Sequence, residues 1–279
     1  MNFLELDITL EPKNPWVDIL IAQLAEIGFD SFQETKNGLQ AYGDAAIVSE
    51  EMAIAQTLLG DQNQAFQCTF QSKVIPQQNW NEQWESQFEP VHVEDYVSII
   101  APFHEKENVK PMVVEIMPKM SFGTGHHQTT YMMTKALFEL DEVPAVALDM
   151  GTGTGVLAIV LEKLGAKEIV AVDIEDWSVE NTIENAQRNE CTQIQAICGD
   201  IDAVPLKSYD LIVANINKNI LFKQMEHYSQ LLKKGGILLL SGFFQSDIPE
   251  LIAKAENFGL VLAKKMEKET WGGLQLLKK

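Results

Sequence analysis

Three glycines at alternate positions, Gly151, Gly153 and Gly155, form a GxGxG motif in the stretch "DMGTGTG". The motif follows an apolar run and opens a helix-like stretch, so its backbone can approach a ligand where a side chain would not fit. Asp173 follows at the end of the next apolar run, "IVAVD". A carboxylate at that place can accept hydrogen bonds from both hydroxyls of a ribose. These residues predict a site for a ligand that carries an adenosine-like ribose.

A nicotinamide dinucleotide would use the same elements. Its fingerprint, GxGxxG, requires a glycine at the position of Val156, where this chain has a branched apolar side chain. The sequence also contains no recognisable set of residues for the proton relay that hydride transfer needs. A dinucleotide-dependent oxidoreductase is therefore disfavoured, but it remains an alternative.

A second glycine-rich stretch, "SFGTGHHQTT", spans residues 121–130 and precedes the glycine motif. It lies between the strand-like "PMVVEIM" and the helix-like "TTYMMTKALFEL", which predicts a second loop over the same ligand. His126 and His127 do not predict a metal site, because adjacent side chains diverge and no Cys, His or acidic cluster nearby completes a set of ligands. We expect His127 to fix the loop by hydrogen bonds and His126 to be exposed.

Asn215 ends the apolar run "DLIVAN", at the carboxyl edge where α/β sheets bind ligands. Its amide oxygen can accept a hydrogen bond from an amine without carrying a charge that would favour the ammonium form. The alternative is that Asn215 only caps the following helix. Trp271, in "TWGG", is a candidate wall of a substrate channel, and packing in the core is the equal alternative.

The stretches "DMGTGTGVLAI", "AVDIE", "GDID" and "DLIVANI" together resemble the S-adenosylmethionine-dependent methyltransferases that have a doubly wound sheet. By this resemblance the three glycines flank the methionine and ribose portions of S-adenosyl-L-methionine, and Asp173 binds the ribose. Asp200 would lie near the adenine, and Asp149 at the sulfonium end. The alternative for Asp200 is a solvated loop acid. The product of such a reaction is S-adenosyl-L-homocysteine.

A longer set of motifs resembles one family closely. The loop pattern MPxxxFGTGxHxTT, the aromatic residues Trp80, Trp84 and Phe88, and "VANI" are typical of the bacterial methyltransferases of ribosomal protein L-eleven (L11), whose loop usually reads "AFGTGTHPTT". The resemblance spans the linker and the whole C-terminal domain. It implies that amines of L11 accept the methyl groups and that the following residues bind the cofactor: Phe122, Gly123, Thr130, Gly151, Asp173 and Asn215.

Two residues depart from the usual loop of this family. His126 stands where a threonine is typical, and Gln128 stands where a proline is typical. These departures predict a looser loop.

Methyl transfer to an amine requires a lone pair on the nitrogen. A lysine ammonium has a pKa near 10.4, so its deprotonation costs about 4 to 5 kcal/mol at pH 7, whereas an α-amine with a pKa near 8 costs about 1 kcal/mol. Burial beside a positive sulfonium lowers the pKa of the amine by desolvation and by repulsion between like charges. The reaction then needs no strong base, and Asn215 is the candidate catalytic residue that orients the amine. The segment "NINK" replaces the "NPPY" of adenine and glutamine-amide methyltransferases, which favours an amine acceptor over a planar one.

The elements that must position these residues form two domains joined by a linker. Residues 1–76 show strand-like and helical spacing in the order βαββαβ, with a two-residue hairpin turn at Asn37-Gly38, and predict a small ferredoxin-like α+β domain for substrate recognition. Residues 77–90 predict a linker helix with one aromatic stripe. Residues 91–279 alternate apolar strand-like runs, "MVVEIM" among them, with helices, and predict a doubly wound, seven-stranded, Rossmann-like α/β methyltransferase domain.

The bulk composition narrows the class of partner. The net charge of -19 disfavours nucleic acid and favours a basic partner such as a ribosomal protein, although acidity can also serve solubility alone. The 3 cysteines are scattered and no apolar run is long enough to span a membrane, so we expect a cytoplasmic protein, and we expect a monomer. The alternatives are a methyltransferase for another protein or small-molecule amine, and a methyltransferase-like binding module without turnover.

Overall fold

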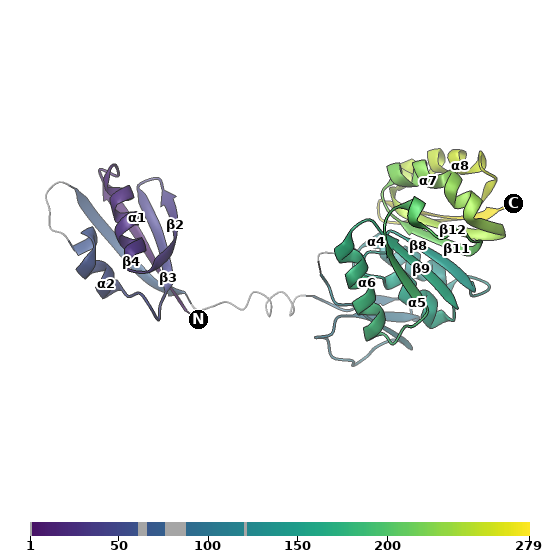
Figure 1. Cartoon of the computed structure of the whole chain (residues 1–279), viewed down its shortest axis with the longest axis horizontal. Helices are drawn as coiled ribbons and strands as arrows, with labels where there is room; N and C mark the ends of the chain where they lie inside the picture. Colours follow the sequence, from purple (N-terminus) through teal and green to yellow (C-terminus); the bar gives the residue numbers. More distant parts are fainter. Residues whose placement is uncertain (1, 61–65, 76–87, 120–121) are drawn as a thin grey trace. The chain divides into compact units, whose positions relative to one another are not determined.

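The computed structural model describes residues 2–60, 66–75, 88–119 and 122–279. The chain divides into two compact units, Met1–Gln87 and Phe88–Lys279, each with its own hydrophobic core (Figure 1). The expected linker helix at residues 77–90 falls outside the described residues, except for residues 88–90, which have no regular structure. Within the described ranges, no helix is both long enough and apolar enough to cross a membrane.

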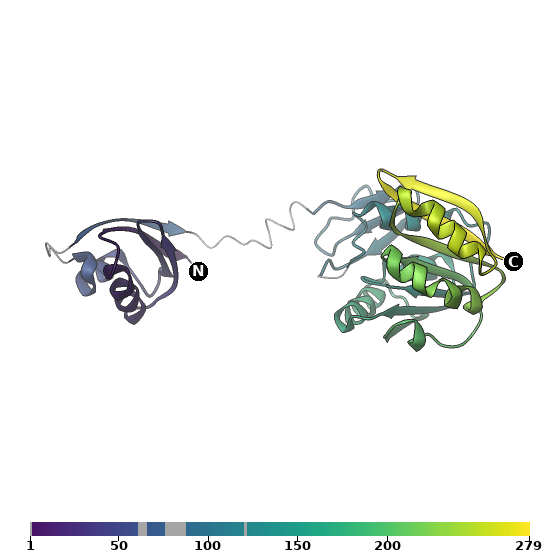
Figure 2. The same ribbon diagram turned by 90° about the horizontal axis from the view of Figure 1, so that it is seen from above.

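The N-terminal unit is an antiparallel sheet with two helices on one face (Figure 2). In chain order its elements are β1 (Phe3–Glu11), α1 (Trp16–Glu26), β2 (Phe29–Thr35), β3 (Gly38–Asp44), α2 (Glu50–Gln56) and β4 (Gln67–Ile75). The described strands lie side by side in the order β2-β3-β1-β4. Every second residue of β1 faces the helices, and these residues form the core with α1: Leu4, Leu6, Ile8 and Leu10.

The hairpin predicted at Asn37-Gly38 is present, but its turn lies one residue earlier. Thr35 pairs with Gly38, so Lys36 and Asn37 are the two turn residues and Gly38 is the first residue of β3. A Cβ atom at Gly38 would lie 1.9 Å from the carbonyl oxygen of Ile8. The glycine is therefore required by the close approach of β1 and not by the turn itself.

The C-terminal unit is built on a mixed sheet with helices on both faces. Its strands are β8 (Val146–Met150), β9 (Glu168–Asp173), β10 (Ile194–Cys198), β11 (Tyr209–Asn215), β12 (Leu232–Phe244), β13 (Leu260–Lys268) and β14 (Trp271–Lys278). They lie in the order β10-β9-β8-β11-β12-β14-β13, and β14 runs antiparallel to both neighbours while the other pairs are parallel. The mostly parallel α/β sheet expected from the sequence is confirmed.

The helices divide the core of this unit into two layers. Its helices are α4 (Gln128–Phe138), α5 (Val156–Leu164), α6 (Asp176–Arg188), α7 (Lys218–Leu231) and α8 (Ile248–Glu256), and short 3-10 turns occupy Ile201–Ala203 and Gln245–Asp247. A further short 3-10 turn, Leu58–Gly60, belongs to the N-terminal unit. Helices α4 and α5 lie on one face of the sheet and α7 and α8 on the other (Figures 1 and 2). Apolar residues of α4 and α5 are buried in one core cluster, and those of α7 and α8 in a second. The sheet is thus shielded on both sides, and its strand ends are left for binding.

One predicted strand lies elsewhere. The run "MVVEIM" forms β7 (Met112–Glu115), which was expected to belong to the α/β pattern of the main sheet. It instead pairs in parallel with β6 (Val97–Ile100), which pairs with β5 (Val91–Val93), in a separate three-stranded sheet. The apolar residues of this run are nevertheless buried, because Val114 and Ile116 pack in the same core as α5.

The parallel strands of the main sheet end at a common carboxyl edge. β9 ends at Asp173, which pairs with Cys198 of β10, and β11 ends at Asn215, which pairs with Ser241 of β12. β8 ends at Met150, directly before the glycine motif. Residues that are far apart in sequence are therefore brought to one edge, as the sequence predicts.

Candidate functional site

The glycine motif turns the chain from β8 into α5. The φ angles of Gly151, Gly153 and Gly155 are 75°, 58° and 82°, a conformation that side chains disfavour. A Cβ atom at Gly151 would lie 2.1 Å from Cγ2 of Ile216, and one at Gly153 would lie 2.2 Å from the carbonyl oxygen of Phe122. Neighbouring segments of the chain therefore enclose the turn. The fold itself requires glycine at these positions, whether or not a ligand is bound.

Asp173 is tied to this turn. One carboxylate oxygen accepts a hydrogen bond from the backbone N–H of Gly153 at 2.9 Å, and the other accepts from the N–H of Glu175 at 3.1 Å. The side chain is half-buried at the end of β9. Each oxygen keeps a second acceptor position. The carboxylate is thus held in one orientation and can still accept hydrogen bonds from two hydroxyls.

Asn215 and Thr130 meet across the edge of the sheet, although 85 positions separate them. The Asn215 Nδ2 group donates to Oγ1 of Thr130 at 3.4 Å. The Asn215 Oδ1 atom is buried and has no hydrogen-bond partner among the described residues. Since Asn217 provides the side-chain cap of α7, by accepting from the N–H of Ile220, the alternative of Asn215 as a helix cap is wrong. Asn215 therefore presents an unused acceptor at the carboxyl edge.

Asp149 is fully buried below the glycine turn. Its Oδ2 atom accepts from Oγ1 of Thr152 at 2.8 Å, and its Oδ1 atom has no partner within the described chain. Burial raises the pKa of this carboxyl to about 7. Unpaired buried oxygens are uncommon in folded proteins, and Asp149 and Asn215 place two of them near one end of the sheet.

The loop that contains Phe122 and Gly123 lies on the glycine turn. The N–H of Thr154 donates to the Phe122 carbonyl at 2.9 Å, and Oγ1 of Thr154 donates to the Gly123 carbonyl at 2.7 Å. His127 caps α4, because its Nδ1 atom accepts from the N–H of Thr129. Burial lowers the pKa of His127 below its usual range, in keeping with a neutral ring that accepts this bond. The expectation that His127 fixes the loop is confirmed.

The two departures from the family loop make contacts of their own. His126 is exposed, as expected, but its Nε2 atom lies 2.8 Å from the carbonyl oxygen of Glu89 and its ring packs edge-on against Phe88. Gln128 donates from Nε2 to Oε2 of Glu269 at 2.9 Å. The expectation of a looser loop overlooked these hydrogen bonds, which tie the loop to residues 88–89 and to the turn between β13 and β14.

Asp200 and Trp271 lie at the same edge in different settings. Asp200 is exposed and accepts from the N–H of Asp202 at 3.0 Å, so one of its oxygens is used as a local cap. Trp271 is half-buried, with its ring 4.6 Å from that of His127 and 4.7 Å from that of Phe244. It therefore belongs to an aromatic row at the carboxyl edge rather than to the interior.

Sequence reasoning missed a polar row on α6. Asn181 and Asn185 in α6 and Asn189 directly after it are buried at four-residue spacing. Asn185 bonds Met117 and Thr154, and Asn189 bonds Glu115 of β7. The signal was the pattern of asparagines in "ENTIENAQRNE", where an amphipathic surface helix would carry apolar residues.

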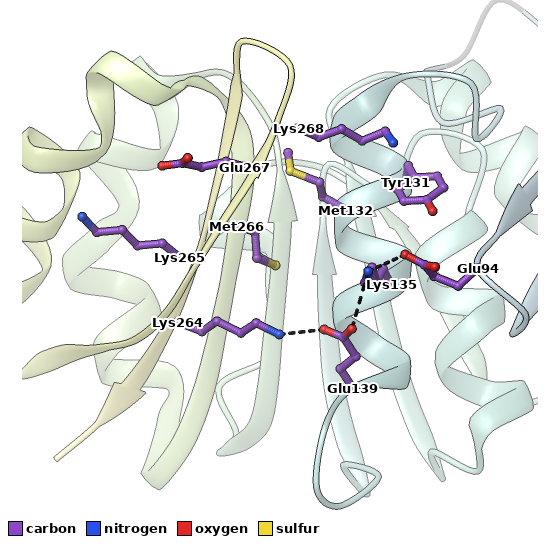
Figure 3. A pocket seen from close by; sticks show the side chains of 10 residues that line it. All are labelled: Glu94, Tyr131, Met132, Lys135, Glu139, Lys264, Lys265, Met266, Glu267 and Lys268. Carbon is purple, nitrogen blue, oxygen red and sulfur yellow. Dashed lines mark hydrogen bonds and ion pairs between the residues drawn. The ribbon is translucent and has the colours of Figure 1, made fainter.

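A groove of about 350 Å³ lies apart from these residues, between α4 and β13 (Figure 3). Lys135 forms ion pairs with Glu94 and Glu139, and Lys264 pairs with Glu139 at 2.7 Å. Lys268 lies over the ring of Tyr131, 3.9 Å from its centre. The side chains that point into the groove thus largely pair with one another, and the groove contains none of the predicted site residues.

The residues at the carboxyl edge fit S-adenosylmethionine. The Asp173 carboxylate suits the ribose hydroxyls, and the buried acceptors of Asn215 and Asp149 suit the hydrogen-bond donors of a polar, positively charged ligand. Across the described residues, no three or more His, Cys, Asp or Glu side chains gather as they would around a metal ion.

Comparison with known proteins identifies the family. The family model described as ribosomal protein L11 methyltransferase matches residues 22–279. The protein of that name from Porphyromonas gingivalis is 42% identical over 96% of this chain and 92% of its own length, and that from Phocaeicola vulgatus is 36% identical over 100% of both. The crystal structure of a ribosomal protein L11 methylase from Lactobacillus delbrueckii subsp. bulgaricus matches with a TM-score of 0.64 and 27% identity, over 69% of this chain and 100% of that one. The chain therefore belongs to the family of ribosomal protein L11 methyltransferases and is an S-adenosylmethionine-dependent methyltransferase.

Proposed function

We propose that this enzyme transfers methyl groups from S-adenosylmethionine to lysine side-chain and N-terminal amines of large-subunit ribosomal protein L11. The observation that carries the proposal is the match to L11 methyltransferases along the whole chain, which includes the N-terminal unit and not the cofactor fold alone. A methyltransferase for an unrelated amine would need to share only the cofactor fold.

The proposed cofactor site consists of residues from six places at the carboxyl edge. Asp173 holds the ribose, and the turn at Gly151, Gly153 and Gly155 lies along the ribose and methionine portions. Phe122 and Gly123 cover the ligand from the loop that rests on Thr154. Thr130 and Asn215 bind at the methionine end, and exposed Asp200 lies beside the adenine.

When bound, S-adenosylmethionine supplies an electrophilic methyl group on a positively charged sulfur. Asn215 is the proposed catalytic residue. Its Nδ2 group is fixed on Thr130, which leaves Oδ1 to accept an N–H of the neutral amine and to direct the nitrogen lone pair toward the methyl carbon. The amide carries no charge, so it does not stabilise the competing ammonium form. The proton that the amine loses goes to solvent.

The N-terminal unit is proposed as a ferredoxin-like substrate-recognition domain, residues 1–76, joined by the segment 77–90 to the methyltransferase domain, residues 91–279. The strand order β2-β3-β1-β4 and the two helices on one face support this assignment. L11 as a basic partner suits the net charge of -19.

The test is the intact mass of purified L11 before and after incubation with enzyme and S-adenosylmethionine. We expect mass gains in steps of one methyl group, and no gain with Asp173→Ala or with L11 whose amines have been chemically blocked. Asp202→Ala, an exposed acid outside the proposed site, is the matched control and should retain full transfer.

Two results would change the assignment. Cofactor binding without any mass gain in L11 would mean that a different amine is the acceptor or that the protein is a binding module. Mass gain on blocked L11 would mean that the acceptor is not an amine.

A further inference from the structure

The buried asparagines of α6 and its C-cap, Asn181, Asn185 and Asn189, occupy a face that would normally be apolar. Asn181 and Asn185 are completely buried, and Asn189 is 8% exposed. A buried amide costs free energy unless its donor and acceptor groups find partners. We therefore expect the side chains of these three asparagines to hold neighbouring segments of the backbone in place by hydrogen bonds.

Asn185 bonds the glycine turn and the segment that precedes the loop of Phe122 and Gly123. Its Nδ2 group donates to the carbonyl oxygen of Thr154 at 2.9 Å, within the glycine turn, and to Oδ1 of Asn181 at 3.1 Å. Its Oδ1 atom accepts from the N–H of Met117 at 2.9 Å. Met117 follows β7 and leads into the loop that carries Phe122. One amide thus bridges two segments that are far apart in sequence.

Asn189 makes the same number of hydrogen bonds but does not reach the turn. Its Oδ1 atom accepts from the N–H of Glu115 at 2.9 Å, and its Nδ2 group donates to the Glu115 carbonyl at 2.7 Å and to the Asn185 carbonyl at 2.8 Å. Asn189 therefore joins β7 to α6 and bonds neither Thr154 nor the loop.

Thr154 is the point where the loop rests on the turn. Its N–H and hydroxyl donate to the carbonyls of Phe122 and Gly123, and its own carbonyl accepts from Asn185. Displacing Thr154 would move the turn and the loop relative to each other. The backbone of Gly153 already lies close to that of Phe122, since a Cβ atom added to Gly153 would be 2.2 Å from the Phe122 carbonyl oxygen. The turn therefore cannot move closer to the loop.

We propose that Asn185 is a positioning residue for S-adenosylmethionine, which sets the distance between the glycine turn and the loop that covers the cofactor. The inference rests on the proposed cofactor site and does not depend on L11 as the substrate. Asn185 acts through Thr154 and Met117 and does not itself touch the cofactor.

The test compares Asn185→Ala with Asn189→Ala in the full-length chain, by calorimetric titration with S-adenosylmethionine and by thermal unfolding. Each variant loses three side-chain hydrogen bonds, of which two are buried at Asn185 and one is buried at Asn189, so both should lower Tm. We expect Asn185→Ala to raise the Kd for S-adenosylmethionine by about tenfold or more, and Asn189→Ala to leave it within about twofold of wild type. In turnover, Asn185→Ala should raise the KM for the cofactor and not the KM for the acceptor.

If either alanine variant is unfolded, the serine variant at the same position replaces it. Serine keeps one polar group, but it is too short to reach Thr154 and Met117 together, so Asn185→Ser should show the same rise in Kd. A folded Asn185 variant with the wild-type Kd would overturn the proposal, and so would an equal rise in Asn189 variants. Failure of the wild type to bind the cofactor would instead contradict the proposed cofactor site.

Discussion

At the scale of single residues, the buried and unpaired Oδ1 atom of Asn215 gives the sharpest expectation about catalysis. A carboxylate at this position would keep the acceptor but add a negative charge, which stabilises the ammonium form of the substrate and raises its pKa. We expect Asn215→Asp to lower kcat at pH 7 by about tenfold or more and to recover part of that loss near pH 9. The measurement is kcat for L11 methylation as a function of pH.

Asn215→Ala is the control for this variant. It removes the acceptor without adding charge, so it should lower kcat at every pH and leave the shape of the profile unchanged. An unshifted profile for Asn215→Asp would show that the residue does not face the reacting amine.

Asp149 gives an expectation about stability. Burial raises its pKa from 3.8 to about 7, so between these values the folded protein holds a proton that the unfolded chain has released. The free energy of unfolding therefore decreases as pH rises through this window. Asp149→Asn removes the titration, and we expect it to flatten the pH dependence between about pH 4 and pH 7 and to exceed the wild type in stability at pH 8.

Denaturant unfolding of the protein without cofactor, at several pH values, measures this effect. The exposed Asp202→Asn variant should follow the wild-type curve. Parallel curves for the wild type and Asp149→Asn would mean that Asp149 does not titrate in this window.

At the scale of elements, the first turn of α4 determines how the loop is held. Gln128 is the first helical residue after the cap His127, and proline is favoured at that position because its missing N–H would have no intrahelical partner. His127 has φ -75° and ψ 138°, a conformation compatible with a following proline. We expect Gln128→Pro to raise the free energy of unfolding by about 0.4 to 1 kcal/mol. Loss of the exposed hydrogen bond from Gln128 to Glu269 offsets part of this gain.

Thr129→Pro is the matched control, one position later. The N–H of Thr129 donates to Nδ1 of His127 and the residue is buried, so a proline there should destabilise the protein. Thermal and denaturant unfolding distinguish the two variants. A loss of stability in Gln128→Pro as large as that in Thr129→Pro would contradict this description of the α4 terminus.

The elements also show what the sequence could and could not reveal. Glycine spacing and strand-end acids are local signals, so the turn at Gly151, the strand end at Asp173 and the main sheet were predictable. Pairing between distant segments is not encoded locally. Nothing in "MVVEIM" distinguishes a strand of the main sheet from β7, and the bond from Gln128 to Glu269 spans 141 positions.

At the scale of the whole molecule, the net charge of -19 predicts that binding of L11 depends on salt concentration. Long-range attraction between an acidic enzyme and a basic protein is screened by salt. We expect the KM for L11 to rise several-fold between about 50 and 300 mM NaCl, while the Kd for S-adenosylmethionine changes by less than about twofold. A KM for L11 that is independent of salt would mean that the acidity serves only solubility.

Sequence motifs covered the linker and the C-terminal unit, whereas the N-terminal unit was predicted only by the order of its elements. The proposed recognition role of that unit is supported by the match of the whole chain to L11 methyltransferases, since strand and helix order alone names no function. The residues of the proposed cofactor site, in contrast, all lie within one unit, Phe88–Lys279, so the site can be tested without knowing how the two units are arranged.

The most direct measurement is a crystal structure of the chain with S-adenosylhomocysteine. The predicted result is ligand density at the carboxyl edge, with both ribose hydroxyls on the Asp173 carboxylate and the amino-acid end near Thr130 and Asn215. Density in the groove between α4 and β13, or a ligand at the edge that does not contact Asp173, would contradict the proposed cofactor site.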